Sequence, residues 1–574
     1  MFKVKSFDKN HPNPIFYRKD YTILNGTWNF YMDYNNKGEK LKFNEGLPVR
    51  KLKKIEVPFS YLTLNSGINK TKRCDNVWYE RTYYLNTKEE GNYFLHFEGS
   101  DYKTKVWVNS KYVGEDIGAY HRLTFDITDM LIEGENVITV KCEDSNSTSQ
   151  PRGKQRWTRK NFMCWYEETT GIFKDVWIEH TPSQYIKSLK ITPDRQSKQV
   201  SFSMDLVGTL KSLNLEVSYK NEVVFSKNLR IDSRPFVYVL ELPNIEEWNV
   251  LDPKLYDVKI KYADDEVLSY FAFRSLQAQN SKVFINGKSV YQKLVLDQGY
   301  FDGGDLTPKS PDDLYNDIKN AILMGFNGCR KHQKREDDRF YTYADMMGFL
   351  VWAEMPSGYK PSKKMFNALF KEWSLIVDEL YNHPSIICWT PINESWGVYK
   401  IHTKKIEQDF VNNLYDYTKE VDPSRFCLTN DGWEHTKSDF LTIHLYDQDF
   451  ITFKDNILNA IHDGNVKTLL PFKYYTFAKG YKYQGQPILI DEFGGISFTQ
   501  KNKGWGYGKA AKSSDEYIRR IEGLYKVLSE IPEVQGYCYT QLTDVKQEIN
   551  GLYTMDRLPK IDPKVMNKIQ NNEK

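Results

Sequence analysis

The sequence lacks the features that mark membrane, secreted or nucleic-acid-binding proteins. No apolar run approaches the roughly 18–20 residues needed to cross a bilayer, so we expect no transmembrane helix and no membrane partner. The N-terminus has no continuous apolar stretch and no small-residue cleavage site, which predicts a chain that is not secreted. With 79 basic and 76 acidic residues, the net charge of +3 is too small to indicate a nucleic-acid partner.

Cysteines and cofactor motifs are equally sparse. The seven cysteines are widely spaced and never form CxxC, a pattern typical of reduced thiols in the cytoplasm rather than of disulfides or a zinc site. No GxGxxG follows a candidate strand, and both GxxxxGK[ST] and HExxH are absent. We therefore predict a cytoplasmic protein that needs no cofactor and no metal for its chemistry.

Aromatic residues, by contrast, are plentiful: they make up 15% of the chain, with 40 Tyr and 13 Trp. Aromatic rings stack on the C–H faces of sugars but also fill hydrophobic cores, so their abundance is a first indication of a carbohydrate ligand and no more. The chain of 574 residues is too long for one hydrophobic core, and its length predicts about two to four domains.

The pattern of apolar residues divides the chain into a β-rich part and a part where strands and helices alternate. Short alternating runs such as 92–97 and 104–109 fill roughly the first 180 residues. The segment 183–274 has the length and strand spacing of a small immunoglobulin-like sandwich. From about 275 on, helical stretches separate eight short apolar runs, which matches a (β/α)8 barrel. An open doubly wound sheet is the alternative.

The expected barrel elements can be given by residue range. The strands are 293–297, 326–331, 349–353, 386–392, 426–429, 440–444, 487–491 and 535–542. The helices are 311–324, 335–347, 363–382, 403–420 and 513–530. Ser310, followed by Pro311 and two acids, has the composition of a helix start.

Two glutamates follow expected strands directly, at the barrel end where active sites gather. They are Glu394, after the run 386–392, and Glu492, after 487–491. A pair of carboxylates at such a place can cleave a glycosidic bond, one protonating the leaving oxygen while the other attacks or activates water. The alternative is that each is a solvated residue where a strand meets a loop. The Asn-Glu pair at 393–394 does not distinguish a catalytic from a solvated glutamate, since the same pair also occurs at 44–45.

Longer segments around these acids resemble glycoside hydrolase family 2, the β-galactosidase/β-glucuronidase family. The segments are 389–396 around Asn393-Glu394, 488–495 around Glu492, 539–557 of the last strand and its loop, 324–332 of the second strand, and, near the N-terminus, 25–28, 106–109 and 170–176. The resemblance spans the whole chain. It implies a jelly-roll sugar-binding domain over 1–182, the immunoglobulin-like β-sandwich over 183–274, and a catalytic (β/α)8 TIM barrel over 275–574.

The resemblance also implies a retaining exo-β-glycosidase that works through a covalent glycosyl-enzyme. Glu394 would be the general acid and then the base, and Glu492 the nucleophile. Asn393 is expected to bind the sugar 2-OH, and Arg330 to border Glu492 and keep it ionised. No metal is needed for this cleavage, although some family members bind structural cations. A homodimer or homotetramer is implied in the same way.

Further candidate substrate ligands lie at expected strand ends or in loops. They are His332, His444, Tyr446, Asp297, Trp396, Trp433, Trp505 and Tyr539. Tyr446 is expected to hydrogen-bond the nucleophile. For the histidines and the aspartate, structural hydrogen bonds or a cap are the alternative, and for the loop tryptophans it is plain packing. Glu354, after 349–353, could line the pocket or form a structural ion pair.

The expected sugar depends on one departure from the family. Its β-glucuronidases carry Asn-x-Lys before the glycine of the last barrel loop, where the sequence here has Glu548-Ile-Asn550-Gly551. Glu548 would repel a uronate, so we predict a neutral β-glycoside, with a β-galactoside first. The alternatives are a β-glucuronidase or another family 2 enzyme such as a β-mannosidase or arabinosidase. A non-catalytic carbohydrate-binding protein is a further alternative.

Overall fold

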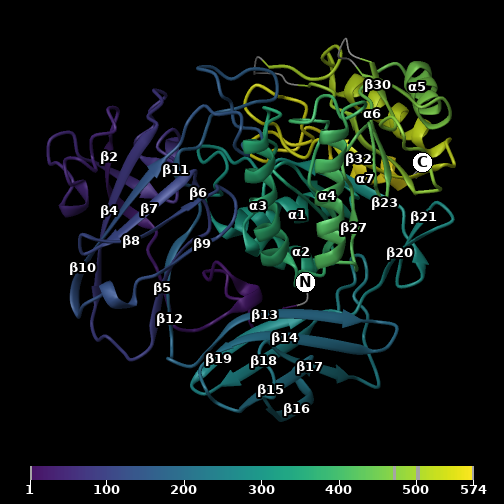
Figure 1. Ribbon diagram of the computed structural model, residues 1–574. Helices are drawn as coiled ribbons and strands as arrows, with labels where there is room; N and C mark the ends of the chain where they lie inside the picture. The colour runs from purple at the N-terminus through teal and green to yellow at the C-terminus, as the bar shows by residue number, and fades with distance from the viewer. Residues whose placement is uncertain (1–2, 469–472, 499–503, 572–574) are drawn as a thin grey trace.

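The computed structural model describes residues 3–468, 473–498 and 504–571. Figure 1 shows a strand-rich body in purple and blue on the left, a teal sandwich below it, and a strand-and-helix body running from green to yellow on the right. No helix in the described ranges is both long and apolar enough to cross a membrane. All seven cysteines are unpaired thiols.

The first domain is built from two main antiparallel sheets, with strand orders β1-β12-β5-β9 and β3-β2-β4-β10-β7-β8. Its strands are β1 (Tyr21–Ile23), β2 (Gly26–Met32), β3 (Lys53–Val57), β4 (Asn76–Leu85), β5 (Asn92–Phe97), β6 (Ser100–Asp101), β7 (Lys103–Val108), β8 (Lys111–Ile117), β9 (Leu123–Asp126), β10 (Gly134–Glu143), β11 (Gly171–Ile172) and β12 (Val176–Thr181). Short 3-10 helices are η1 (Pro14–Phe16), η2 (Phe43–Glu45), η3 (Leu64–Ser66) and η4 (Thr128–Met130). Alternate residues such as Trp28 and Phe30 are buried between the sheets, which confirms the all-β prediction.

The second domain is a smaller sandwich with strand orders β13-β14-β17 and β16-β15-β18-β19. Its strands are β13 (Tyr185–Asp194), β14 (Gln199–Val207), β15 (Ser212–Tyr219), β16 (Glu222–Arg230), β17 (Phe236–Glu241), β18 (Tyr256–Tyr262) and β19 (Asp265–Phe271). In β14 the alternating residues Val200, Phe202 and Met204 are buried in its core. The domain lies at the bottom of Figure 1, under the barrel.

The third body is an eight-stranded sheet in the order β27-β26-β25-β24-β23-β32-β31-β28, paired in parallel throughout. Its strands are β23 (Gln292–Asp297), β24 (Gly328–Lys331), β25 (Leu350–Glu354), β26 (Ile386–Thr390), β27 (Phe426–Cys427), β28 (Leu441–His444), β31 (Ile488–Gly494) and β32 (Val534–Thr540). Short antiparallel strands beside it are β20 (Leu276–Gln279), β21 (Lys282–Ile285), β22 (Lys288–Ser289), β29 (Asn465–Lys467) and β30 (Lys473–Tyr475). All eight predicted barrel strands are present.

Helices cover the outside of this barrel (Figure 1). They are α1 (Pro311–Leu323), α2 (Asp338–Met347), α3 (Lys363–Leu380), α4 (Lys405–Val421), α5 (Phe450–His462), α6 (Ser514–Ser529) and α7 (Pro563–Asn571). The predicted start of α1 is confirmed: Ser310 and Asp313 form a capping box around Pro311. Five helices were expected, and α5 and α7 were missed.

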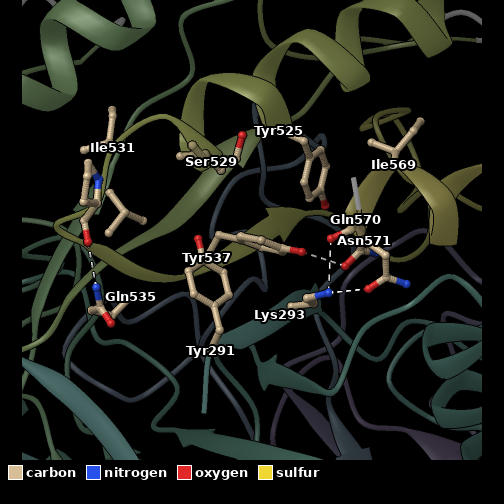
Figure 2. A pocket seen from close by; sticks show the side chains of 13 residues that line it. Tyr291, Lys293, Tyr525, Ser529, Ile531, Gln535, Tyr537, Ile569, Gln570 and Asn571 are labelled. Atoms are coloured by element: carbon tan, nitrogen blue, oxygen red, sulfur yellow. Dashed lines mark hydrogen bonds between the residues drawn. The ribbon is translucent and has the colours of Figure 1, made fainter. Parts of the chain in front are cut away.

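The two ends of the barrel are lined by different residues. A cavity of about 430 Å³ lies at the N-terminal end, between the starts of β23 and β32 and helices α6 and α7. Figure 2 shows Tyr291 and Tyr537 there, with the Tyr537 hydroxyl donating to Gln570 and Lys293 bonded to the C-terminal helix. The carboxyl ends of all eight strands meet at the opposite end, where parallel barrels place their active sites.

A buried charge network fixes the first domain to the barrel. Glu98 accepts a 2.6 Å hydrogen bond from Arg122 and lies 3.6 Å from Arg335 of the barrel, and Arg122 also bonds Asp338 of α2 at 2.6 Å. Burial by itself would raise the pKa of the Glu98 carboxyl, but the two arginines outweigh it and lower this pKa to about 2.

Glu98→Gln is therefore expected to lower the free energy of unfolding by about 3 kcal/mol at pH 7, because Arg122 and the buried Arg335 lose one counter-charge each and keep only Asp338 and its neighbours. A carboxyl with a lowered pKa stabilises the fold above its usual value of 4.5, and this contribution fades as the pH falls toward about 2. Urea unfolding between pH 7 and pH 3 measures both effects. The exposed pair of Lys454 and Glu530 gives the control, since Glu530→Gln is expected to leave the midpoint unchanged. A pH-independent deficit would contradict the assignment.

Candidate active site

Glu394 and Glu492 lie together at the carboxyl end of the barrel. Glu492 belongs to β31, and Glu394 follows β26 by four residues. One oxygen of each carboxyl, together with a ring nitrogen of His444, lies within 4.8 Å of the others. The Glu394 side chain is 17% exposed and that of Glu492 is 5% exposed. The two acids thus face one common space at the mouth of the barrel.

The backbone at Glu394 has an uncommon conformation. Both Glu394 and Ser395 have positive φ values, 52° and 57°. Non-glycine residues in this region are strained by about 1–3 kcal/mol each and cluster at functional sites. Hydrogen bonds from the Glu394 amide to the Asp431 carbonyl and from the Ser395 amide to Asn430 hold the turn in place. The turn leaves the Glu394 carboxyl 2.9 Å from the ring of His444, the last residue of β28.

Glu492 is surrounded by donors. Arg330 donates to it at 3.0 Å, the Tyr446 hydroxyl donates to its other oxygen, and His444 is its neighbour in the β28–β31 pairing. Burial would raise the pKa of the Glu492 carboxyl, but the charges of His444 and Arg330 and the Tyr446 hydrogen bond hold it far below its usual value. Glu492 is therefore a carboxylate at neutral pH, as a nucleophile or base must be.

Arg330 is the central cation of the site and is fully buried. Four carboxyl groups surround its guanidinium: Glu354 at 2.8 Å, Asp431 at 2.5 Å, Glu492 at 3.0 Å and Asp491 at 3.8 Å. These charges hold its pKa far above the usual value despite burial. A planar guanidinium with five N–H donors suits such a crowded position.

Asn393 is oriented by the same guanidinium. Arg330 donates to its side-chain oxygen at 3.0 Å, which fixes the amide with its Nδ2 group on the other side. This Nδ2 is buried, and no acceptor for it exists among the residues that the structure describes. A buried N–H donor without a partner is costly, so Nδ2 is available to a ligand hydroxyl.

The Glu394 carboxyl is held by two ring donors. His444 Nδ1 lies 2.9 Å from one oxygen, and Trp396 Nε1 donates to the other at 3.3 Å. The Trp396 ring in turn packs edge to face on Trp165 and Tyr359, with centroid distances of 5.1 Å and 5.6 Å. Because Trp165 belongs to the first domain, the surroundings of Glu394 are completed across the domain boundary.

The loop between β10 and β11 of the first domain, residues 144–170, covers the Glu394 side of the barrel mouth and is called the covering loop below. The backbone amides of Arg152 and Gly153 donate to the Ser357 carbonyl at 2.8 Å and 3.1 Å. The predicted ligand Trp505 binds the same loop, since its indole N–H donates to the Met163 carbonyl at 2.8 Å. The Tyr166 hydroxyl of the loop hydrogen-bonds Glu548. The loop is thus anchored at several points around the site.

Two other predicted ligands, His332 and Trp433, contact residues that border the two acids. His332 pairs with Glu354 at 2.8 Å, and Glu354 in turn pairs with Arg330 at 2.8 Å. The Trp433 ring lies 5.7 Å from that of His444 and stacks on Tyr474 at 4.3 Å.

Two predicted ligands are engaged with other groups. Asp297 forms a 2.8 Å ion pair with Lys331 and accepts the Gly299 amide. Tyr539 is fully buried, with its ring packed against Phe493 and Tyr525. The structure does not bring either side chain together with the two glutamates.

The sequence analysis missed two aspartates of the site, Asp431 and Asp491. Both are fully buried and contact Arg330. Asp431 follows β27 by four residues, the same offset that separates Glu394 from β26, so its strand-end position was a usable signal. Asp491 directly precedes Glu492, and nothing in the sequence distinguishes it from an ordinary strand residue.

Three groups of side chains in the described part of the chain have the spacing of metal ligands. One, Asp20 with Glu89 and His180, lies at the surface of the first domain, and His444 belongs to both of the others. These two are Glu394 with His444 and Glu492, and Asp431 with His444 and Asp491. Burial would lower the pKa of the His444 ring, but the charges of Glu492 and Asp491 raise it well above its usual value. A protonated imidazole has no free lone pair to offer a metal ion, so the donor set favours a cationic histidine over a bound cation.

Two family models match the chain. The model described as "Glycosyl hydrolases family 2, sugar binding domain" matches residues 21–182, and "Glycosyl hydrolases family 2, TIM barrel domain" matches residues 276–498. These ranges contain the covering loop and both glutamates.

Individual relatives carry two different names. A putative beta-glucuronidase of Formosa agariphila is 24% identical over 83% of this chain and 57% of its own length, so the chain spans little more than half of that relative. A beta-galactosidase of Thermoanaerobacterium thermosulfurigenes is 25% identical over 94% of this chain and 74% of its own. The solved Ruminococcus gnavus beta-glucuronidase superposes with a TM-score of 0.80 at 17% identity, covering 100% of both chains. At that identity the likeness establishes the fold.

Replacement of Arg330 tests the charge balance of the site. Arg330→Met is expected to lower the free energy of unfolding by about 3–5 kcal/mol at pH 7.5, since buried carboxylates lose their cation. Their pKa values then rise, and a carboxyl with a raised pKa costs stability as the pH increases, so the loss is smaller at pH 5. Urea unfolding at both pH values measures this difference. Arg330→Lys, which keeps the charge without the planar fork, is the matched control and should lose less. Equal losses at both pH values would refute the charge account.

Proposed function

Because the chain belongs to glycoside hydrolase family 2, we propose that it is a retaining exo-β-glycosidase acting on terminal neutral β-linked sugars. The observation that carries the proposal is the close pair of Glu394 and ionised Glu492, with an oxygen of each within 4.8 Å. Retaining enzymes hold their two carboxyl groups about 5–5.5 Å apart, too close for a water molecule between them. An inverting enzyme needs about 6.5–9.5 Å.

The geometry supports a double displacement. Glu394 gives its proton to the glycosidic oxygen while Glu492 attacks the anomeric carbon, so the bond to the leaving group breaks and an ester to Glu492 forms. Glu394, now ionised, then removes a proton from water, which attacks the same carbon and releases Glu492. The unpaired Nδ2 of Asn393 is placed to donate to the sugar 2-OH, a contact that strengthens in the transition state.

Glu548 supports a neutral sugar, with a β-galactoside first. Its carboxyl is buried, 2% exposed, and held by the Tyr166 hydroxyl and by Asn550 at 3.0 Å. It occupies the position of the asparagine in the uronate-binding Asn-x-Lys motif, so it would repel a sugar carboxylate.

A β-glucuronidase is the second candidate, and Lys154 is the observation that favours it. The Lys154 side chain is half-buried in the covering loop. Burial lowers the pKa of its ammonium, but the charges of Cys164, Glu548, Glu394 and Glu492 outweigh burial and raise it. A cation so close to the catalytic acids could pair with a uronate. Turnover of a panel of nitrophenyl β-glycosides separates the two candidates: hydrolysis of the β-glucuronide alone would overturn the neutral-sugar proposal, and tight binding without turnover would indicate a carbohydrate-binding protein.

The cellular setting is part of the proposal. Seven unpaired thiols suit a reducing compartment, so we place the protein in the cytoplasm. A homodimer or homotetramer remains a prediction that light scattering of the purified protein would test.

Restoring the uronate motif tests the role of Glu548. The double variant Glu548→Asn, Asn550→Lys is expected to raise kcat/KM for the β-glucuronide relative to the β-galactoside by about 10–100-fold, because a charge-assisted hydrogen bond is worth about 1.5–3 kcal/mol. Steady-state kinetics on both nitrophenyl substrates gives the ratio. Asn550→Lys alone is the control and should change the ratio less, since Glu548 still neutralises the new lysine. An unchanged ratio in the double variant would remove Glu548 from sugar selection.

Chemical rescue tests the roles of the two glutamates. Glu492→Ala is expected to lose activity by roughly 10⁴–10⁶-fold, as is typical when a nucleophile is removed. Azide can then enter the vacated space and attack the anomeric carbon, giving the α-glycosyl azide. Glu394→Ala is the matched control, because azide there intercepts the glycosyl-enzyme and gives the β-azide. The anomer is assigned by proton NMR. If Glu492→Ala gave the β-azide and Glu394→Ala the α-azide, the roles of the two glutamates would be reversed.

A further inference from the structure

Below the two glutamates lies a buried pair of aspartates. Asp491 precedes Glu492 in β31, Asp431 follows β27, and both are fully buried. One oxygen of each lies within 4.8 Å of the other and of His444. Burial and the charge of Asp491 raise the pKa of Asp431 far above its usual value, against the pull of Arg330. Asp431 therefore holds a proton at neutral pH, and the charge of the pair acts on His444 from Asp491.

His444 separates this pair from the catalytic glutamates. Its Nε2 lies 3.3 Å from Asp491 and 3.9 Å from Asp431, whereas its Nδ1 lies 2.9 Å from Glu394 and 3.5 Å from Glu492. Both ring nitrogens therefore face carboxylate oxygens. A neutral imidazole can donate from only one nitrogen, but an imidazolium donates from both.

One cation and two rings also lie around His444, and the cation acts against its charge. Arg330 Nη1 lies 3.5 Å from Nε2, and His435 is close enough for the two rings to influence one another. His435 itself is neutral, since burial lowers its pKa to about 4. The ring of Trp433 lies edge to face with that of His444, with 5.7 Å between the centroids. A neutral His444 that accepts from Arg330 is thus the competing state. The charge of Glu492 contributes most against it, and the charge of Asp491, on the other side of the ring, contributes next.

We propose that the Asp431–Asp491 pair keeps His444 protonated, so that His444 is a permanent cation shared by Glu394 and Glu492 and Asp491 is a positioning residue for both steps of hydrolysis. The role of this cation in hydrolysis rests on the proposed function, whereas its existence in the resting protein does not.

The shared cation matters because negative charge moves between the two glutamates during the reaction. Glu492 carries the charge before the first step and loses it when the ester forms, while Glu394 gains the charge by giving up its proton. The second step reverses both changes. Since Nδ1 of His444 is within 3.5 Å of an oxygen of each, one cation can balance the charge in either place without leaving its position.

The resting charge of His444 is measured directly by nitrogen NMR of protein labelled in its histidines. At pH 7 an imidazolium gives two similar nitrogen shifts, whereas a neutral ring gives two well-separated ones, and His444→Gln assigns the signal. We expect the imidazolium pattern in the wild-type protein and a neutral pattern in the double variant Asp431→Asn, Asp491→Asn. Both carboxyls must be removed, because Asp431 left alone loses the like charge that raises its pKa and then carries the negative charge itself. A neutral pattern in the wild type would overturn the inference even if the protein hydrolyses glycosides. An imidazolium without turnover of any glycoside would instead overturn only the proposed function.

The pH dependence of kcat/KM gives a second measurement. A cation favours the ionised form of a neighbouring carboxyl, so its loss in the double variant Asp431→Asn, Asp491→Asn disfavours the ionised forms of both glutamates. Both limbs of the profile are then expected to move to higher pH by about one unit or more. Asp431→Asn is the matched control: it leaves the charge of the pair on Asp491, 3.3 Å from His444, and should leave the limbs in place. A lower kcat in the double variant with unmoved limbs would reduce the aspartate pair to a packing role and refute the inference.

Discussion

The site depends on the burial of one guanidinium among four carboxyl groups. A charge in a dry interior is tolerated only with a partner, and Arg330 is the partner of Glu354, Asp431, Asp491 and Glu492 at once. The same group orients Asn393 through its side-chain oxygen. The ionised state of the nucleophile and the free donor for the substrate are therefore two consequences of a single cation, fixed on β24 by the barrel core.

Most of the fold could be predicted because the barrel strands are buried on both faces and appear in the sequence as short apolar runs. Helix α1 could be predicted from Ser310 and Pro311, whose capping chemistry is local. Helix α5 begins with Phe-Ile-Thr-Phe at 450–453, aromatic and β-branched residues that favour strands in isolation. Its helical state is set by packing on the barrel, with Phe453, Ile457 and Ala460 buried, which no local signal gives.

The candidate site was predictable to the extent that its residues follow strands. Glu394 and Glu492 have that position and lie together. Tyr446 donates to Glu492 as the family pattern suggests, and His444 contacts both acids. Asp491 was not predictable, because its effect, which is to raise the pKa of Asp431, joins two residues 60 positions apart in the sequence (491 − 431). The pKa of Asp431 depends on its distance from Asp491, and a sequence does not give the distances between strands.

The covering loop of the first domain has a consequence for how such proteins can be rearranged. Trp165 supports the tryptophan that binds Glu394, and the amides of Arg152 and Gly153 are bonded to the barrel rim. The barrel therefore cannot be transferred alone. Fused to a different β-rich domain, it would keep both glutamates but lose the covering loop that packs around Glu394. Recombination within this architecture is constrained to exchange the β-rich domain and the barrel as a matched set.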